Sequence, residues 1–430
     1  MTPPPRGSNQ VGLGQFNERV VLQALRVHGP LPKAQIARLT HLTAQTVALI
    51  IVRLTRRKLV RKCAPLRGRV GQPSVPIALN PDGAFGIGVH VGRRRMDLLL
   101  VDFVGAVRHR SVLDYSFPEP DAVVRAVARD VRTVHKKLGA EDSRRLQGIG
   151  MAAPLSLGGW RELLGISAAR AARWDEIDIG ARIGARSGLP VHNIKDTAAA
   201  CVAELVAGRG REIGSYAYFF VDTFIGGGLV LDHRLYRGAH GNAGAVGSMP
   251  LGVLSPGSSS LGRIASRAAR QKTPSPSSIA RGAVQTPPQL LSQASLFRLE
   301  AMLAAAGLPL DVVRSTAADG QRRAAVVRRW LRDAAPAIAH AVQSVTCVLD
   351  VNDVIVDGAV SRELLDELLR AVDRALDGHS WEGVARPRLR RGDIGSDARA
   401  LGAALLPIYA NYAPERGTLS PLAPSTNFVA

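Results

Sequence analysis

The chain has 430 residues, 46% of them apolar and 21% charged, and this length predicts two or three domains rather than one. The composition excludes an intrinsically disordered protein. The sequence has no run of 18 or more apolar residues, so we expect no membrane span. The first ten residues carry one positive charge and no apolar stretch follows, so we expect no secretory signal and a cytoplasmic protein. The 3 cysteines are far apart, which favours free thiols over a disulfide framework or a zinc site.

The net charge of +21 is concentrated at one end of the chain. Residues 1–80 contain 13 Lys or Arg and a single acid, Glu18, and so carry +12 of that charge. A general arginine bias of the sequence explains part of this excess, but it does not explain the local density. Such a segment predicts a polyanionic partner, because contacts between basic side chains and phosphates release counterions.

The apolar spacing within residues 15–80 predicts three short helices. They are expected over 16–28, ending at Gly29-Pro30, over 33–39, and from a cap at Thr43 onward. The residues expected to face the core are Phe16, Val21, Leu22, Leu25, Ile36, Leu39, Val47, Ile50, Ile51 and Leu54. This spacing is typical of a helix-turn-helix, whose third helix would expose Ala44, Gln45, Thr46, Ala48 and Arg53.

A basic wing is predicted directly after the third helix. Leu59-Val60 begins a strand, a loop rich in Gly, Arg and Pro follows, and residues 75–79 return. Gln pairs with adenine, Thr contacts the thymine methyl group, Arg binds guanine or phosphate, and wing arginines enter minor grooves. A solvated basic loop is the alternative. The candidate DNA-binding residues are Thr43, Ala44, Gln45, Thr46, Arg53, Arg56, Arg57, Arg67, Arg69 and Gln72.

From Phe85 onward the pattern changes to alternating strands and helices. Three antiparallel strands are expected with turns at 92–95 and 104–105, followed by a helix over 121–138 and a strand at "LQGIGMAAP". The pattern is completed by a helix and a strand over 174–193, a helix from Asp196, strands around Gly226–Gly228 and a strand at "VNDVIVDGAVS". Two such strand–hairpin–strand–helix–strand units predict an α/β chain of the actin-like ATPase (ribonuclease H-like) fold, with two lobes facing a cleft.

Five motifs follow one another along the chain: "GQPSVPIALN", "GIGVHVG", "VHNIKDTAAACVAE", "FIGGGLVLDHRLYRGAHGNAG" and "DVIVDGAVS…ALGAALLP". Their order resembles that of the ROK family of repressors, open reading frames and sugar kinases. The resemblance covers residues 17–412, and the leading winged helix is similar to the repressor branch. It implies a ROK domain over 83–415, with lobe 1 over 83–195 and lobe 2 over 196–405. We expect tails at 1–14 and 416–430. The Ser/Pro/Arg-rich interval 253–290 favours a disordered insertion, with a phosphorylated or partner-binding loop as the alternative.

The resemblance also implies where a kinase would hold its substrates. Asp196 matches the catalytic base of an Asn-Asp pair, but Lys195 stands in the place of the asparagine. In the first phosphate turn, 90–94, His90 replaces the metal-organising acid and two arginines replace small residues. In the second phosphate turn, 222–228, Asp222 and Phe224 stand where kinases have Gly-Thr-Gly. An acid and a phenyl ring disfavour close approach of a polyphosphate, so ATP turnover is not expected.

The sugar side of the family pattern is altered as well. The Glu and His of its Ala-Gly-Glu-x-Gly-His motif are replaced by Ala245 and Ser248, and the cysteine-rich zinc segment is absent, so we expect neither metal nor cofactor. The polar residues that remain predict a small ligand, unless the site is vestigial. The candidate ligand-binding residues are Asn193, Lys195, Asp196, Asn242 and Ser248.

These patterns together predict a ligand-responsive, DNA-binding regulator, most consistent with a repressor of carbohydrate uptake or catabolism genes. The expected partners are a double-stranded DNA operator, a sugar, polyol or sugar-phosphate effector, and a second or further copies of the chain in a homodimer or homotetramer. The alternative is a sugar kinase with an appended DNA-binding domain and Asp196 as its base.

Overall fold

The computed structural model describes residues 10–65, 74–154, 167–252, 287–308 and 320–414. The chain divides into two compact units, which are described separately below. The first unit comprises Met1–Tyr218, Gly227–Gly244 and Gly392–Ala430, and the second comprises Phe219–Gly226 and Ala245–Arg391.

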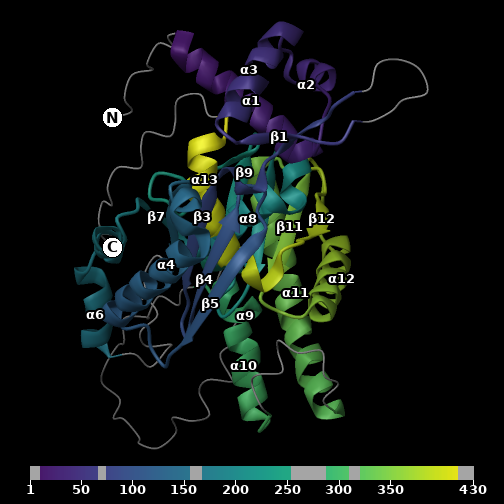
Figure 1. Ribbon diagram of the computed structural model, residues 1–430. Coiled ribbons are helices and arrows are strands. Elements are labelled where there is room, and N and C mark those ends of the chain that lie inside the picture. The colour runs from purple at the N-terminus through teal and green to yellow at the C-terminus, as the bar shows by residue number, and fades with distance from the viewer. Residues whose placement is uncertain (1–9, 66–73, 155–166, 253–286, 309–319, 415–430) are drawn as a thin grey trace, which may run out of the picture. The chain divides into compact units, whose positions relative to one another are not determined.

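The first unit begins with a winged helix-turn-helix (Figure 1). Its elements are α1 (Gln10–His28), α2 (Lys33–Thr40), α3 (Ala44–Arg56), β1 (Val60–Lys62) and β2 (Ile77–Leu79). The two strands pair antiparallel, with Val60 opposite Leu79, as the predicted wing requires. Val21, Leu22, Leu25, Ile36 and the apolar residues of α3 are buried, so the predicted helical spacing is confirmed. The tip of the wing, with Arg67, Arg69 and Gln72, lies outside the described residues.

Three details of this module differ from the prediction. The first helix begins at Gln10, so it extends into the interval expected to be an N-terminal tail, and Phe16 is only half-buried. Leu39 was expected to face the core, but its side chain is 41% exposed. Helix α2 has only two turns and ends at Thr40, where His41 takes a left-handed conformation, and Ile36 is the one residue of this helix that is buried.

The body of the first unit is built on a five-stranded sheet with the order β5-β4-β3-β6-β7. Its strands are β3 (Phe85–Val91), β4 (Arg95–Asp102), β5 (Val107–Asp114), β6 (Leu146–Ala153) and β7 (Val191–Lys195). As predicted, β3, β4 and β5 are antiparallel neighbours. Strands β3, β6 and β7 run parallel to one another. The helices between these strands are α4 (Pro120–Ser143), α6 (Ala168–Glu176) and α7 (Ile179–Ser187).

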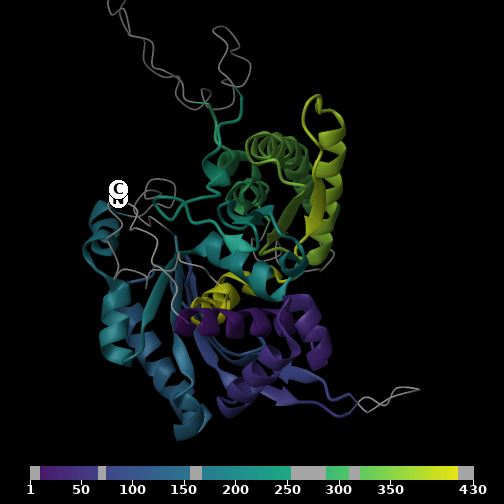
Figure 2. The same ribbon diagram turned by 90° about the horizontal axis from the view of Figure 1, so that it is seen from above.

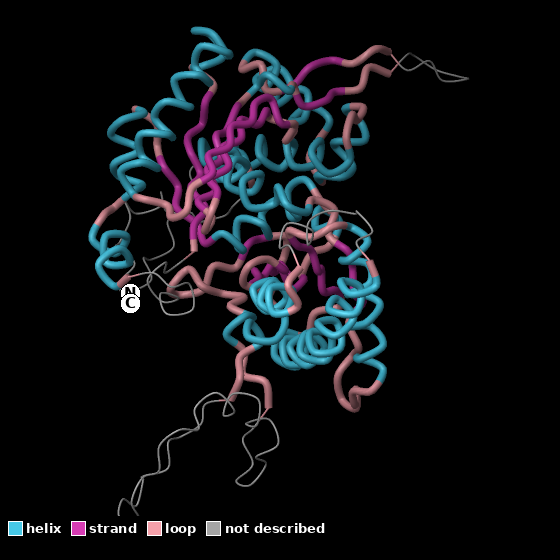
Figure 3. The backbone as a smooth tube through the Cα atoms, turned by 90° about the horizontal axis from the view of Figure 1, so that it is seen from below, coloured by secondary structure: helices cyan, strands magenta, loops and turns pink. Residues whose placement is uncertain are grey.

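Both faces of this sheet are covered by helices (Figure 3). Ile87, Val89 and Val91 of β3 share a core with apolar residues of α4 and α7. Successive side chains of a strand point to opposite faces, so Gly86 and Gly88 face the other side. There the backbone of α13 (Ala398–Tyr412) lies so close that a Cβ on Gly88 would come within 2.1 Å of a carbonyl oxygen of α13.

Helix α13 also packs against α8 (Asp196–Ala207), which follows β7 directly. A Cβ on Gly402 of α13 would lie 1.7 Å from the carbonyl oxygen of Ala199. These close approaches place residues 196–218 and 398–412 in the first unit, whereas we expected lobe 2 to run from 196 to 405.

A second five-stranded sheet has the order β10-β9-β8-β11-β12. Its strands are β8 (Tyr216–Val221), β9 (Gly226–Leu231), β10 (Arg234–Leu235), β11 (Asp353–Gly358) and β12 (Arg388–Arg391). Of the second unit's helices, α11 (Gln321–Leu349) packs against three others, α9 (Leu290–Ala294), α10 (Leu296–Ala305) and α12 (Arg362–Asp377). Short 3-10 helices occur at η1 (Pro81–Gly83), η2 (Arg209–Glu212), η3 (Val246–Ser248) and η6 (Gly395–Asp397).

Most of the expected insertion at 253–290 lies outside the described residues, as does the expected C-terminal tail at 416–430. The exception is the end of the insertion, because α9 begins at Leu290. Within the described ranges no single helix is long and apolar enough to cross a membrane, although α2 and α3 taken together, bent by 113°, meet that length and composition.

Candidate functional site

Helix α3 begins where the sequence predicts, because Thr43 caps it. The backbone of Thr43 is extended, and its hydroxyl oxygen accepts a hydrogen bond from the backbone N–H of Thr46 at 3.1 Å. This bond satisfies one of the N–H groups that a helix leaves unpaired in its first turn. The cap therefore fixes the residue at which the outer face of α3 starts.

Replacing Thr43 with alanine removes this cap and is expected to cost about 1 kcal/mol of unfolding free energy, as N-cap substitutions commonly do. Chemical denaturation followed by circular dichroism measures the loss. Thr43→Ser retains the accepting hydroxyl and is expected to lie within about 0.5 kcal/mol of the parent chain. Equal stability of all three proteins would contradict the assigned role of the cap.

The outer face of α3 combines polar and apolar side chains. Gln45, Leu49, Val52 and Arg56 follow one another at helical spacing, and all are exposed. Leu49 and Val52 are 58% and 54% exposed, and the sequence analysis assigned neither residue to the outer face. Apolar side chains on a recognition helix contact the thymine methyl group in the major groove. The spacing itself carried the signal, because Leu49 and Val52 fall between the buried positions of the helix.

Arg53 and Arg57, which we expected to contact DNA, both bind Glu18 of α1. The distances are 2.9 Å from Arg53 Nε to Glu18 Oε1 and 2.8 Å from Arg57 Nη1 to Glu18 Oε2. The only acid of the basic segment therefore holds two of its arginines against α1. Arg56 is exposed, and no hydrogen bond or ion pair of its side chain is found within the described ranges, which leaves its guanidinium available for a phosphate or a base.

The winged helix is joined to the body of the first unit through Arg26 and Phe103. Helix α1 lies beside α13 (Figure 2). Arg26 Nη1 donates to the carbonyl oxygen of Phe103 at 3.1 Å, and its guanidinium lies 5.1 Å from the centre of the Phe103 ring. Burial lowers the pKa of Arg26 to about 10. The Phe103 ring in turn meets the Tyr412 ring of α13 edge-on at 5.0 Å, so the winged helix-turn-helix is connected to the same helix that packs on the central sheet.

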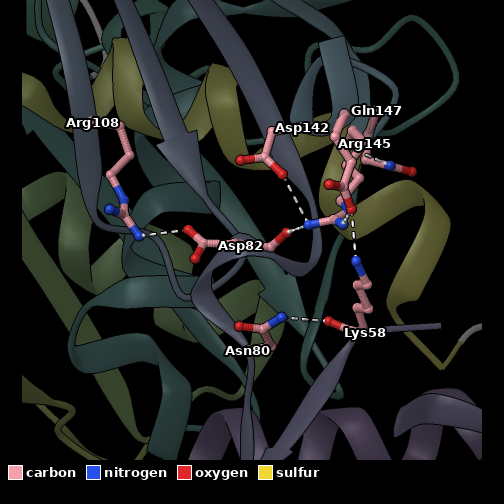
Figure 4. A network of polar contacts seen from close by, with 8 residues as sticks. Lys58, Asn80, Asp82, Arg108, Asp142, Arg145 and Gln147 are labelled. Carbon is pink, nitrogen blue, oxygen red and sulfur yellow. Dashed lines mark hydrogen bonds and ion pairs between the residues drawn. The ribbon is translucent and has the colours of Figure 1, made fainter. Parts of the chain in front are cut away.

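A second contact joins the base of the wing to the turn between α4 and β6 (Figure 4). Lys58 Nζ lies 2.6 Å from Glu141, whose carboxylate also binds Arg145 at 2.7 Å. The amide of Asn80 donates to the carbonyl oxygen of Lys58 at 2.7 Å, and Arg145 donates to the carbonyl oxygen of Asp82 at 2.9 Å. The linker between wing and body is therefore bound on both sides.

The candidate ligand residues gather where β7 ends. Parallel strands end at one edge of their sheet, and α/β proteins commonly bind ligands there. Lys195 is the last residue of β7 and Asp196 the first of α8. Lys195 Nζ donates to the side-chain oxygen of Asn242 at 2.8 Å, which brings two predicted residues together. Asp196 accepts a hydrogen bond from the N–H of Thr197 at 2.7 Å, so it stabilises the start of α8.

Two candidate residues are placed differently. The amide of Asn193 lies against Gly180 of α7, where a Cβ would be only 2.7 Å from its nitrogen. Asn193 and Lys195 are on the same face of β7, but the Asn193 side chain is held against the helix that covers that face. Ser248 lies on η3 in the second unit, so its part in the same site stays a prediction.

His90, in the first phosphate turn, is a buried imidazole. Its side chain is 4% exposed, and Nδ1 lies 3.6 Å from Asp97 Oδ2. Burial, and then the charge of Arg399, lower the pKa of His90, so the imidazole is neutral at pH 7. A neutral imidazole supplies neither the negative charge nor the oxygen ligand with which a carboxylate organises Mg²⁺. Across the described residues no group of three or more His, Cys, Asp or Glu side chains is arranged to hold a metal ion.

The second phosphate turn is covered by its own chain. The N–H of Ile225 donates to the Ser295 hydroxyl at 2.9 Å, and the carbonyl oxygen of Asp222 accepts from the N–H of Leu296 at 2.9 Å. The rings of Phe224 and Phe297 lie 5.8 Å apart. The start of α10 therefore lies against this turn, and the N–H of Ile225, which could otherwise donate to a phosphate, already has a partner.

The glycines after the turn serve packing. Gly226–Gly228 form the start of β9 rather than a free loop. A Cβ on Gly228 would lie 2.6 Å from Cβ of Cys201, which is buried on α8. Gly244, with φ of +73°, then lies against the backbone of Gly228. Gly228 is therefore explained by the contact between α8 and β9, and Gly244 by its own contact with the backbone of Gly228.

A winged helix-turn-helix followed by the two mixed sheets of the actin-like fold defines the class of this protein. The chain belongs to the ROK family, whose model matches residues 86–409.

The chain is similar to both regulators and enzymes of that family. It is 33% identical over 230 residues to the bifunctional enzyme NanE/NanK of Brucella melitensis, a match that covers 53% of this chain and 37% of that enzyme. It is 22% identical over 254 residues to the xylose repressor of Bacillus subtilis, covering 58% of this chain and 64% of the repressor. The solved structure of a ROK family transcriptional regulator, a homologue of the E. coli MLC protein, has a TM-score of 0.62 at 19% identity and covers 94% of this chain and 97% of that one.

Proposed function

We propose that this protein is a DNA-binding transcriptional regulator of the ROK family that acts in the cytoplasm on genes of carbohydrate uptake or catabolism. The observation that carries the proposal is the exposed face of α3, with Gln45 and Arg56 beside two apolar side chains, in a segment that carries one acid among 13 basic residues. Such a face suits the major groove of DNA. The similarity to the xylose repressor supports the link to carbohydrate genes.

The DNA-binding residues we propose are those of the α3 face and of the wing. Gln45, Leu49, Val52 and Arg56 would read bases or contact phosphates, and Ala44 and Thr46 lie at the same end of the helix. Arg67, Arg69 and Gln72 would extend the contact along the DNA from the wing. Arg53 and Arg57 reach phosphate only by leaving Glu18, so we assign them a smaller part.

A homodimer or homotetramer would place two such helices on one operator, and an effector bound near Lys195 would change their spacing. The contacts of Arg26 and Lys58 support this route, because they hold the winged helix-turn-helix against the body of the same unit. A gel shift with DNA from upstream of the gene tests the proposal: binding should be selective and should weaken as salt rises. Binding that depends on neither sequence nor salt would oppose it.

The second candidate function is a sugar kinase, which Asp196 and the similarity to NanE/NanK favour. The buried, neutral His90 and the covered second phosphate turn argue against it, because both would have to rearrange before ATP could bind.

We therefore expect no ADP release above background over a panel of hexoses, pentoses and N-acetylhexosamines. A coupled ADP-release assay measures this, with Asp196→Asn as the matched control that removes the only candidate base. Robust turnover in the parent chain that Asp196→Asn abolishes would establish the kinase instead.

A further inference from the structure

Two basic side chains near the end of β7 have neutral hydrogen-bond partners. Lys195 Nζ binds the side-chain oxygen of Asn242, and Arg237 Nη2 donates to the backbone carbonyl oxygen of Asn193 at 3.4 Å. Both side chains are half-buried. Among the described residues neither Lys195 nor Arg237 forms an ion pair with a carboxylate.

Other arginines of the first unit do pair with acids. Examples are the pairs Arg95–Asp114, Arg108–Asp102, Arg182–Asp121 and Arg209–Asp393. The contrast matters because taking a cation out of water costs free energy unless an anion compensates it. Burial lowers the pKa of Arg237, and burial also lowers that of Lys195, where the charge of Asp196 offsets only part of the effect.

The two cations are held by one closed loop. The N–H of Ala243 donates to the carbonyl oxygen of Arg237 at 3.0 Å, which joins the ends of the segment 237–243. Gly238 and Gly241 have φ of +73° and +68°, a conformation that favours glycine, so the tight path of the loop is built into the sequence. Arg237 and Asn242, one at each end, bind Asn193 and Lys195, which lie two residues apart on β7 and so about 7 Å apart along the strand.

A further basic group lies next to this loop. The Nδ1 atom of His192 is buried and has no hydrogen-bond partner in the described part of the chain. Burial, and then the charge of Arg237, lower the pKa of His192, so the ring is neutral at pH 7 and can donate or accept a hydrogen bond. His192 faces the opposite side of the strand from Lys195, so its effect on a ligand would pass through Arg237.

We propose that the effector of this regulator is an anionic sugar derivative, whose carboxylate or phosphate group binds Lys195 and Arg237. This inference rests on the proposed function and names its ligand class. The guanidinium of Arg237 presents a planar fork that suits either anion, and Lys195 supplies a compact point charge. Asp196, beside Lys195, accepts hydrogen bonds from sugar hydroxyl groups. The acid group binds away from Asp196, because two anions close together repel each other.

The test uses the full chain and sets of related sugars. Glucose, galactose, mannose and N-acetylglucosamine are compared, where the compounds exist, with their uronic acids and their 6-phosphates, and with inorganic phosphate. Isothermal titration calorimetry at physiological salt gives the affinities. At least one sugar acid or sugar phosphate is expected to bind at least tenfold more tightly than its neutral parent. The two kinds of derivative distinguish a carboxylate from a phosphate effector.

Two variants connect the affinity to the side chains. Lys195→Met and Arg237→Gln keep the first two methylene groups of each side chain and remove its charge. Each is expected to weaken binding of the anionic sugar at least tenfold and to leave any binding of the neutral parent within twofold. Arg234→Gln is the matched control, because Arg234 is an exposed arginine close by on β10, and we expect no change. Unchanged melting temperatures show that the variants are folded.

Three results would overturn the inference. They are neutral sugars that bind as tightly as their acids, an equal loss for both kinds of sugar in the two variants, and the absence of binding across the whole panel. Operator binding by the same proteins without ligand is measured in parallel. If selective DNA binding persists, the proposed function stands although the ligand class is wrong, and if DNA binding is absent as well, the proposed function itself fails.

Discussion

Replacing both Gln45 and Arg56 with alanine is expected to weaken binding to a specific operator by about 100-fold or more. Each lost base contact costs about 1–3 kcal/mol, and separated contacts are close to additive. The two side chains are exposed on α3, and neither contributes to the core, so the variant should fold normally. Fluorescence anisotropy with a labelled duplex measures the affinity at several salt concentrations.

A matched control is Arg186→Ala, which removes one exposed positive charge from α7 in the body. Its affinity should stay within about threefold, because a distant charge contributes only through the general field of the protein. The single variant Gln45→Ala should lose sequence discrimination with little change in salt dependence. Arg56→Ala should lower the salt slope by about one if Arg56 contacts phosphate. Wild-type affinity in the double variant would exclude the α3 face as the DNA-reading surface.

Gly402→Ala is expected to lower the free energy of unfolding by about 3 kcal/mol, because a methyl group cannot fit between α13 and α8. A Cβ at this position would lie 1.7 Å from the carbonyl oxygen of Ala199 and 3.0 Å from the backbone nitrogen of Ala203. Because backbone atoms are in the way, the two helices would have to separate. Helix α13 also packs on β3 and β6, so the disturbance reaches the central sheet.

The comparison for this experiment is Gly14→Ala in α1, where nothing lies within 4 Å of the added Cβ. Alanine favours a helix over glycine, so this variant should be equally stable or more stable by up to about 1 kcal/mol. Urea denaturation of the three proteins, followed by circular dichroism, gives the difference. If Gly402→Ala unfolds at the same urea concentration as the parent chain, the close contact between α8 and α13 is not as described.

Local patterns predicted the local structure well. The helical spacing of apolar residues around Val47 and Ile50, and the hydroxyl of Thr43, gave the start and the buried face of α3. Alternation and turn residues likewise gave the three antiparallel strands that follow Phe85. These elements are determined by neighbours in the sequence, which a single chain displays directly.

Contacts between distant parts of the chain could not be read in the same way. Gly86 and Gly88 belong to one of the family motifs. Glycine is required at both positions because the backbone of α13, more than 300 residues later, lies against them. Likewise, the bond from Ile225 to Ser295 joins segments 70 residues apart, so the sequence did not indicate that the second phosphate turn is covered. The ion pair between Arg53 and Glu18 could not be predicted either, because the two residues are 35 positions apart and no sequence periodicity relates them.

The contact between two of the candidate ligand residues agrees with the sequence analysis, and their role in binding stays a prediction. The substitution at Lys195 was visible in the sequence, and its partner Asn242 was among the expected residues. Arg237 was missed, because an arginine in a turn after a strand is usually a solvated surface residue. Only the closed loop, held by the bond between Ala243 and Arg237, places its guanidinium against β7.

Enrichment of binding sites from a random duplex library tests most directly whether α3 reads DNA sequence. The full chain and the Gln45→Ala variant are taken through the same rounds of selection, followed by sequencing. We expect the parent chain to enrich one motif, present as two half-sites about one helical turn or a multiple apart, and the variant to lose its preference at specific bases of each half-site. Recovery of unrelated sequences by the parent chain, at an affinity no better than for random DNA, would contradict the account.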